Sequence, residues 1–304
     1  MKFYKYHGAG NDFLIADGRE TCIDLGAESI SALCDRHTGF GADGVMVLED
    51  SEDFDFRMRY YNSDGSGGMM CGNGGRCIVA FAADLGFRHF RFEAPDGPHE
   101  AELISGETAA FTNLPRIVRL GMKNVSGAMP YYGDGGCDWF LDTGTRHLVR
   151  FVDDIDKLDV VGEGRRLRYD PRFAPVGVNV NFVKVNSPRD IVVRTYEKGV
   201  EDETLACGTG ITASAMASWI AFRIAASRAD TSAGYNLSGE PFIVNEPGPV
   251  VCSVRARIAE LKVTFTPSLV LRSGESPEFS AEDVFLTGPA VFVGMVSTHN
   301  CSLL

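Results

Sequence analysis

The 304-residue chain has little positive charge: 29 Lys and Arg stand against 41 Asp and Glu, which gives a formal net charge of −12. Nucleic acids bind to clustered Lys and Arg, so this balance argues against a broad nucleic-acid surface. A small anion is not excluded, because a few backbone N–H groups at a helix N-terminus can hold a carboxylate. We therefore expect a small-molecule partner and no nucleic acid.

Long hydrophobic runs are also missing. The longest candidate, residues 284–296, is interrupted by Thr287, Gly288 and Pro289 and is too short to cross a bilayer. Residues 1–7 show no apolar segment of the kind that directs secretion. We therefore expect a cytoplasmic protein that does not bind membranes.

Metal-binding spacings are absent from the eight cysteines, which include no CxxC pair and are accompanied by no His-x-x-x-His spacing. We expect no metal ion, and no motif implies pyridoxal phosphate or another cofactor. Cysteines of a cytoplasmic protein are expected to be thiols. Most of them are expected to be small buried hydrophobic residues.

The chain does have the length and apolar content of two globular domains. Of its residues, 44% are hydrophobic and 23% charged, and its 34 glycines indicate tight turns and close backbone approaches. Helical patterns cover residues 28–36, 74–85 and 210–227, and the last is apolar on most faces, so we expect it to be buried. A loop is expected over residues 228–240. Strand-like alternation dominates elsewhere, over residues 3–6, 13–16, 45–48, 56–61, 90–92, 101–104, 117–120, 148–152, 178–185, 191–196, 250–254, 261–265 and 291–296.

One pattern occurs twice along the chain. In the first copy, Arg-Tyr-Tyr-Asn at residues 59–62 is followed by Cys-Gly-Asn-Gly at 71–74. In the second, Arg-Thr-Tyr-Glu at 194–197 is followed by Cys-Gly-Thr-Gly at 207–210. Each copy reads as a strand, a loop and a helix that opens on Cys-Gly-x-Gly, and the copies lie close to half the chain apart. The repeat predicts two domains of like architecture, each with a cysteine at a helix N-terminus.

A helix N-terminus favours a negatively charged sulfur. The first N–H groups of a helix lack internal partners and the helix dipole is positive there, so the pKa of a thiol falls from about 8.5 toward neutrality. The same N–H groups can bind a carboxylate. Two such thiols, on opposite faces of one carbon next to a carboxylate, can remove a proton from one face and return another to the opposite face. We therefore expect stereoinversion alpha to a carboxylate.

A lone Cys-Gly-x-Gly is a weak signal, and a single cysteine before a glycine is more often structural. The duplication favours a functional role for Cys71 and Cys207. A structural role is expected for the others, which are Cys22, Cys34, Cys77, Cys137, Cys252 and Cys301.

At these residues the sequence resembles the diaminopimelate epimerase family, and the resemblance covers nearly the whole chain. The motifs that carry it are long and occur in the family's order. They are His-Gly-Ala-Gly-Asn-Asp-Phe (7–13), Gly-Phe-Gly-Ala-Asp-Gly (39–44), Asn-Ser-Asp-Gly-Ser (62–66), Cys-Gly-Asn-Gly-Gly-Arg-Cys (71–77), Thr-Gly-Thr-Arg-His (143–147), Asn-Val-Asn-Phe (179–182), Glu-Lys-Gly (197–199) and Glu-Thr-Leu-Ala-Cys-Gly-Thr-Gly (203–210).

The resemblance implies a cofactor-independent isomerase that interconverts LL- and meso-diaminopimelate in lysine and peptidoglycan precursor synthesis. It also implies an α+β fold of two pseudo-symmetric domains, each a strand-rich sheet wrapped around a central helix, with the site in the cleft. We place the N-terminal domain at residues 1–115 plus 288–304 and the C-terminal domain at residues 116–287. A homodimer is a further possibility.

Position by position, the resemblance implies the members of the site. Cys71 and Cys207 match the family's two catalytic cysteines, and His147 and Glu197 match residues that assist proton transfer and orient the substrate. The remaining residues match substrate-binding positions. These are the side chains of Asn11, Asn62, Thr145, Asn179 and Lys198, and the carboxylate cradles of Gly72 with Asn73 and of Gly208 with Thr209.

Several positions depart from the family's common pattern, among them Gly44 and the glycine-rich segment 66–68, and two others bear on the grip on a distal carboxylate. Lys198 stands where members commonly carry Arg, and Lys offers a point charge where Arg grips a carboxylate in a bidentate way. Arg146 directly precedes His147, where many members have Pro. We expect Arg146 to compensate for the weaker grip of Lys198.

Other interpretations remain open from the residues alone. His147 could be an ordinary partly exposed histidine, Glu197 a solvated carboxylate, and Asn11 a cap or turn residue. A proline or hydroxyproline racemase with the same fold is the nearest functional alternative, although the polar set of Asn11, Asn62, Asn179 and Lys198 favours a longer diamino-dicarboxylate. A non-catalytic amino-acid binding protein and a thiol redox switch are the others.

Overall fold

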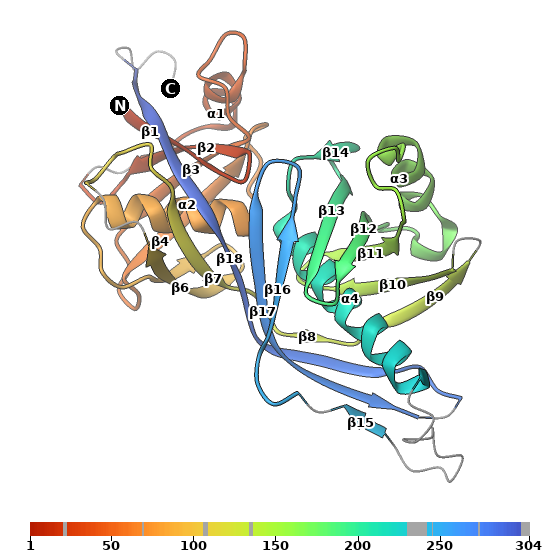
Figure 1. Cartoon of the computed structure of the whole chain (residues 1–304). Coiled ribbons are helices and arrows are strands. Elements are labelled where there is room, and N and C mark those ends of the chain that lie inside the picture. Colours follow the sequence, from red (N-terminus) through yellow and green to blue (C-terminus); the bar gives the residue numbers. More distant parts are fainter. Residues whose placement is uncertain are drawn as a thin grey trace. The chain divides into compact units, whose positions relative to one another are not determined.

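The computed structural model describes residues 1–20, 23–68, 70–105, 109–133, 136–229, 242–244, 246–272 and 274–298 (Figure 1). The chain divides into two compact units: the first contains Met1–Gly121 and Thr287–Leu304, and the second contains Met122–Leu286. Strand β7 (Arg116–Gly121) therefore belongs to the first unit, whereas the sequence-based division placed it in the second. The last strand, β18 (Glu278–Ser297), begins in the second unit and ends in the first.

The first unit is a ring of eight strands. From β1 to β7, each strand is hydrogen-bonded to the next strand in the sequence. Strand β18 pairs with both β7 and β1 and so closes the ring. Helix α1 (Ala27–Cys34) packs against β3. The remaining strands are β1 (Lys2–Gly8), β2 (Asn11–Asp17), β3 (Gly44–Glu49), β4 (Phe56–Asn62), β5 (Arg91–Ala94) and β6 (Gly97–Ser105).

Helix α2 (Gly72–Asp84) is the buried centre of this unit. All of its residues except Ala83 are buried, and it contacts β1, β2 and β7. At its C-terminal end, Asp84 accepts hydrogen bonds from the Tyr6 hydroxyl on β1 (2.5 Å) and from Arg116 Nε on β7 (3.1 Å). This buried ion pair fixes the helix to the strands beside it, so the opposite, N-terminal end of α2 has a defined position.

The second unit repeats the plan. Its sheet runs in the order β9, β10, β11, β12, β13, β16, β17, β15, and β14 pairs with β13. The pairings β11–β12 and β13–β16 are parallel, and the others are antiparallel. The strands are β8 (Val125–Ser126), β9 (Met129–Gly133), β10 (Gly136–Asp142), β11 (Arg146–Phe151), β12 (Asn179–Ser187), β13 (Asp190–Glu197), β14 (Asp202–Thr204), β15 (Phe242–Val244), β16 (Val250–Arg255) and β17 (Glu260–Leu271).

Helix α4 (Gly208–Ala229) lies against β10–β13, β16 and β17. It tolerates burial because its small polar side chains bond to its own backbone: Thr212, Ser214 and Ser218 each donate to the carbonyl four residues earlier, at 2.7–3.0 Å. The helix continues to Ala229, so the loop expected to start at residue 228 does not begin there, and the rest of that segment to residue 240 lies outside the described residues.

Helix α3 (Val160–Arg168) and the short 3-10 helix η1 (Pro171–Phe173) were not predicted from the sequence. Two glycines weaken the helical pattern of α3. Gly164 is needed there because a Cβ at this position would lie 2.4 Å from Cβ of Tyr196, against which the helix packs. Strands β8, β9, β10, β14 and β15 were also not predicted. No described helix is long and apolar enough to cross a membrane.

Candidate active site

Cys71 is the N-cap of α2. Its backbone is extended (φ −116°, ψ 152°), and its carbonyl accepts the first helical hydrogen bond from Gly75 N at 2.8 Å. Its sulfur accepts from Gly74 N at 3.2 Å. The Cys-Gly-x-Gly motif therefore directs a half-buried sulfur at the N–H groups of the first turn, where a thiolate is stabilised.

A series of side-chain hydrogen bonds lies beside the first turn of α2. Arg76 Nη2 donates to Asn73 Oδ1 (2.7 Å), Asn73 Nδ2 donates to Asn11 Oδ1 (2.5 Å), and Asn11 Nδ2 donates to Asp43 Oδ2 (3.1 Å). The series runs from the Arg76 cation to the Asp43 carboxylate, so the charges at its two ends orient the amides of Asn73 and Asn11. The structure thus brings together Asn11 and Asn73 but does not join Asn62 to them by hydrogen bonds.

Arg76 was not predicted as a site residue, although it lies inside the quoted Cys-Gly-Asn-Gly-Gly-Arg-Cys motif. Its side chain is fully buried, and burial lowers its pKa to about 10. It donates to the carbonyls of Gly72 (2.9 Å) and Pro289 (3.4 Å), and no carboxylate of the described residues forms an ion pair with it. The sequence contained a signal for this contact, because an Arg three residues after Asn73 lies on the same helix face and can reach its side chain.

Asn62 ends β4 and stays within its own turn. Its Nδ2 donates to Ser66 Oγ at 3.0 Å, and its backbone N donates to Ser66 O at 2.9 Å. Asp64 Oδ1 accepts from the Ser66 backbone and hydroxyl. The turn chemistry read from Asn-Ser-Asp-Gly is therefore present, and substrate binding by Asn62 stays a prediction.

Cys207 occupies the corresponding place before α4. Its carbonyl accepts from Ile211 N at 2.8 Å, and its side chain is buried, with 7% of the residue exposed. Its sulfur lies 3.5 Å from Thr209 Oγ1. Both units thus place a cysteine immediately before a buried helix, as the repeat predicted.

The second unit gathers three predicted site residues around the hydroxyl of a fourth, Thr209. Thr209 Oγ1 lies 2.9 Å from His147 Nε2, 3.0 Å from Thr145 Oγ1 and 3.5 Å from Cys207 Sγ. His147 is fully buried on β11, not partly exposed, and burial lowers its pKa to about 3. The imidazole is therefore neutral at physiological pH.

Asn179 is hydrogen-bonded to the backbone of Arg146 and of Lys198, two positions that depart from the family pattern. Its Nδ2 donates to the Arg146 carbonyl (3.2 Å), and its Oδ1 accepts from the Lys198 backbone N (2.8 Å). The side chains of Arg146 and Lys198 are exposed. The side-chain amide of Asn179 is hydrogen-bonded to the backbone of both residues and therefore holds the two backbone positions together. Glu197, the last residue of β13, is half-buried.

The sequence of the chain also matches a known family. A sequence model described as Diaminopimelate epimerase matches residues 3–113 and 139–237. The chain belongs to the diaminopimelate epimerase family. Its relatives include a diaminopimelate epimerase of Chlorobaculum tepidum, 45% identical over 217 residues that cover 70% of this chain and 81% of that protein. Another, from Hydrogenobaculum sp., is 34% identical and covers 98% of this chain and 99% of that protein.

The fold is also that of more distant solved structures. A hydroxyproline epimerase from Agrobacterium vitis, crystallised with trans-4-hydroxy-L-proline, aligns with 97% of this chain and 91% of its own at a TM-score of 0.57 and 13% identity. The strand-rich α+β architecture expected from the sequence, with a central helix in each of two units, is confirmed.

The remaining described cysteines do not stand immediately before a helix: they are Cys34, Cys77, Cys137 and Cys252. Burial raises the pKa of Cys34 to about 11 and that of Cys252 to about 12, and it raises the pKa of Cys77 further. Buried thiols of this kind are poor nucleophiles and bases. Cys137 is half-buried, and Cys22 and Cys301 lie outside the described residues.

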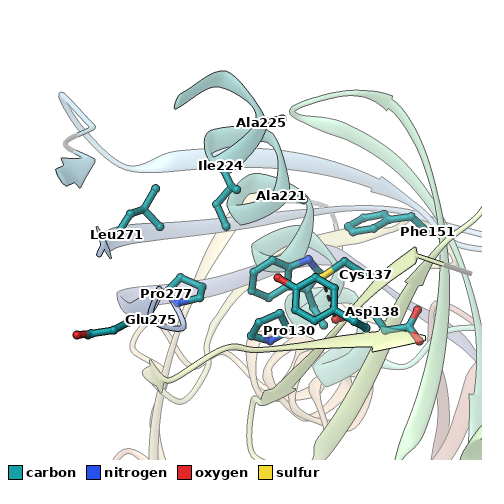
Figure 2. A pocket seen from close by; sticks show the side chains of 12 residues that line it. Pro130, Cys137, Asp138, Phe151, Ala221, Ile224, Ala225, Leu271, Glu275 and Pro277 are labelled. Atoms are coloured by element: carbon teal, nitrogen blue, oxygen red, sulfur yellow. Dashed lines mark hydrogen bonds between the residues drawn. The ribbon is translucent and has the colours of Figure 1, made fainter. Parts of the chain in front are cut away.

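A cavity of about 360 Å³ lies in the second unit, between α4 and strands β9 and β10 (Figure 2). Apolar side chains such as Ile224, Leu271 and Pro277 line it together with Cys137 and Asp138. None of the predicted site residues is among its lining residues. In the part of the chain that the structure describes, no group of three His, Cys, Asp or Glu is placed to hold a metal ion.

The buried, neutral His147 makes stability depend on pH. Between pH 6.5 and about 3, the unfolded chain binds a proton at this histidine that the folded chain does not bind. The stabilisation is complete above pH 6.5, and the free energy of unfolding falls by about 1.4 kcal/mol per unit of acidification below it. We expect the His147→Gln variant to lose this part of the slope in urea titrations at pH 7.5, 5.5 and 4.5.

The exposed His37 supplies the control for this slope. A His37→Gln variant is expected to keep the pH dependence of the unmodified chain. Equal slopes for the unmodified chain and the His147→Gln variant would contradict a neutral buried imidazole.

Proposed function

We propose that the chain interconverts LL- and meso-diaminopimelate without a cofactor, by transferring protons at the α-carbon through Cys71 and Cys207. The observation that carries the proposal is the repeated placement of a cysteine immediately before a buried, glycine-opened helix, once in each unit. Membership of the diaminopimelate epimerase family supports the substrate. Such a reaction serves lysine and peptidoglycan precursor synthesis.

The proposed chemistry uses the two cysteines as base and acid. The thiolate of one takes the α-proton, so the C–H bond breaks and an S–H bond forms. The thiol of the other gives its proton to the opposite face of the same carbon, so its S–H bond breaks and a new C–H bond forms. The two residues exchange roles when the opposite stereoisomer is the substrate.

Negative charge develops on the substrate carboxylate as the α-proton leaves. The N–H groups of the first helical turns, at Gly72 and Asn73 and at Gly208 and Thr209, are donors suited to hold it. Because these groups are fixed by the helices, they need no reorganisation during the reaction. We assign His147 and Glu197 to orienting the substrate and assisting proton transfer, and Asn11, Asn62, Thr145 and Asn179 to holding it.

The exposed Arg146 and Lys198 are proposed to bind the distal carboxylate together. We expect Arg146→Ala to raise the KM for diaminopimelate by about tenfold, because one charge-assisted hydrogen bond is lost, and to leave kcat nearly unchanged. Steady-state kinetics in both reaction directions measures this. The exposed Arg166 on α3, which pairs with Glu163, is the matched control: Arg166→Ala should leave KM unchanged. An unchanged KM in Arg146→Ala would contradict the assignment.

The function itself is tested with a chiral assay of the purified chain. LL-diaminopimelate should convert to an equilibrium mixture with the meso form, with reductant present and without added pyridoxal phosphate. L-proline and trans-4-hydroxy-L-proline should remain unchanged, since neither offers a distal amino-carboxylate group for Arg146 and Lys198. Conversion of proline or hydroxyproline alone would favour the racemase alternative. No conversion of any substrate by folded protein would favour a binding protein or a thiol switch.

We further propose that the chain acts in the cytoplasm. Cys34, Cys77 and Cys252 are free thiols, which fits a reducing compartment. The expected homodimer stays a prediction, and light scattering at assay concentration measures it.

A further inference from the structure

Four hydrogen-bonding contacts run in sequence from the sheet of the second unit to the sulfur of Cys207. Thr195 Oγ1 on β13 lies 2.9 Å from Asn181 Oδ1 on β12, and Asn181 Nδ2 lies 3.0 Å from His147 Nδ1 on β11. His147 Nε2 then lies 2.9 Å from Thr209 Oγ1, which lies 3.5 Å from the sulfur. Thr195, Asn181 and His147 are buried, and none is charged in this setting.

The direction of each hydrogen bond follows from what the groups can do. Asn181 Nδ2 also lies 3.3 Å from the Leu148 carbonyl, which can only accept, so the amide nitrogen must face it. The opposite amide orientation would set two oxygens against each other. The Thr195 hydroxyl therefore donates to Asn181 Oδ1, and Asn181 Nδ2 donates to His147 Nδ1. Since His147 is neutral, its proton lies on Nε2.

The Nε2–H group points at two hydroxyls, of Thr145 (2.8 Å) and Thr209 (2.9 Å). Thr145 Oγ1 also accepts from Asn179 Nδ2 at 3.5 Å, so its own proton is directed to Thr209 Oγ1 at 3.0 Å. Thr209 thus receives donors from both His147 and Thr145. Its own hydroxyl proton is left to donate to Cys207 Sγ, within the range of a hydrogen bond to sulfur.

We propose that Asn181 and Thr195 are positioning residues that hold His147 as the Nε2–H tautomer, so that the Thr209 hydroxyl donates to Cys207 and stabilises its thiolate. The relay delivers a hydrogen bond to the sulfur through neutral side chains. A donor to a thiolate stabilises the charged form over the thiol. The assignment of a catalytic role to Cys207 rests on the proposed function, but the relay itself is a property of the second unit alone.

The tautomer can be observed directly. In protein labelled with ¹⁵N-histidine, two-bond ¹⁵N–¹H couplings distinguish Nε2–H from Nδ1–H, and the His147→Gln variant identifies the signal. We expect Nε2–H in the unmodified chain and a mixture of tautomers in the Asn181→Leu variant. An Nδ1–H tautomer in the unmodified chain overturns the proposal.

The effect on the sulfur is measured by alkylation. In a Cys71→Ala background, iodoacetamide modification of Cys207 is followed by peptide mass spectrometry, and the rate at pH 7.5 is divided by the rate at pH 10. The ratio reports the thiolate fraction and removes differences in access. We expect Thr209→Val to lower the ratio about tenfold, Asn181→Leu and Thr195→Val to lower it less, and Thr209→Ser to restore it.

The control is Ser218→Ala, which removes another buried hydroxyl of α4 whose partner is Ser214 O, and it should leave the ratio unchanged. An unchanged ratio in Thr209→Val overturns the relay even if the chain epimerises diaminopimelate. Conversely, a lowered ratio in Thr209→Val together with no epimerisation of diaminopimelate by the unmodified chain would refute the proposed function and leave the relay standing.

Discussion

Alanine in place of either Cys71 or Cys207 is expected to lower the rate of epimerisation by about 10⁴-fold or more, because each variant lacks the base on one face or the acid on the other. The helix N–H donors and the amides of Asn11 and Asn73 remain in both variants, so substrate should still bind. Chiral chromatography of the LL and meso forms, followed in both directions, measures the rates. Calorimetric titration with diaminopimelate measures the binding.

Two other buried cysteines provide the controls for this loss. Cys77 lies within α2, six residues after Cys71, and Cys252 lies on β16. Burial raises the pKa of both thiols, and neither serves in the proposed chemistry. Cys77→Ala and Cys252→Ala should therefore retain kcat, with at most a modest loss of stability. Full activity in Cys71→Ala or in Cys207→Ala would contradict a mechanism with two bases.

Alanine at Gly210 is expected to damage both the fold and the activity. Helix propensity alone predicts that the change stabilises α4 by about 1 kcal/mol. A Cβ at this position, however, would lie 2.2 Å from Asn181 Oδ1 and 3.3 Å from His147 Cε1, and Asn181 is held by Thr195. We expect a net loss of about 1–3 kcal/mol in the free energy of unfolding and a fall of about 10²-fold in kcat/KM.

Urea unfolding and steady-state kinetics of the Gly210→Ala variant measure these two effects. The matched control is Gly248→Ala in the same unit, where a Cβ meets no atom within 4 Å. That variant should keep the stability and kinetics of the unmodified chain. A stabilised and fully active Gly210→Ala variant would show that α4 does not need this close approach to Asn181.

The sequence was sufficient for the parts of the fold that depend on local pattern. The helical patterns over residues 74–85 and 210–227 correspond to α2 and α4. The apolar composition of the second correctly indicated burial as far as Ile220, but the residues from 221 to 227 are half-buried or exposed. The repeat located both cysteines at helix ends because Cys-Gly-x-Gly fixes the cap locally. Helix α3 was missed because Gly164 serves a contact with Tyr196, a residue far away in the sequence.

The hydrogen-bond partners of the site could not be predicted from local pattern. His147 and Asn179 are opposite each other only because β11 and β12 pair in parallel, and this register also brings Asn181 to His147 Nδ1. The full burial of His147 results from the same packing of strands. Local pattern does not show this packing, and from the sequence the side chain could be only partly buried. Such contacts depend on strand register and helix packing, which the repeat does not specify.

The proposal that two cysteines act on one α-carbon is tested most directly by the fate of the α-hydrogen in D₂O. LL-diaminopimelate is converted to a small extent, and both stereoisomers are separated and analysed by mass spectrometry. We predict one deuterium in the meso product and essentially none in the remaining LL substrate, because the acid thiol has exchanged with solvent while the base returns the hydrogen it removed. Equal deuterium in substrate and product, or an unlabelled product, would contradict the two-cysteine mechanism.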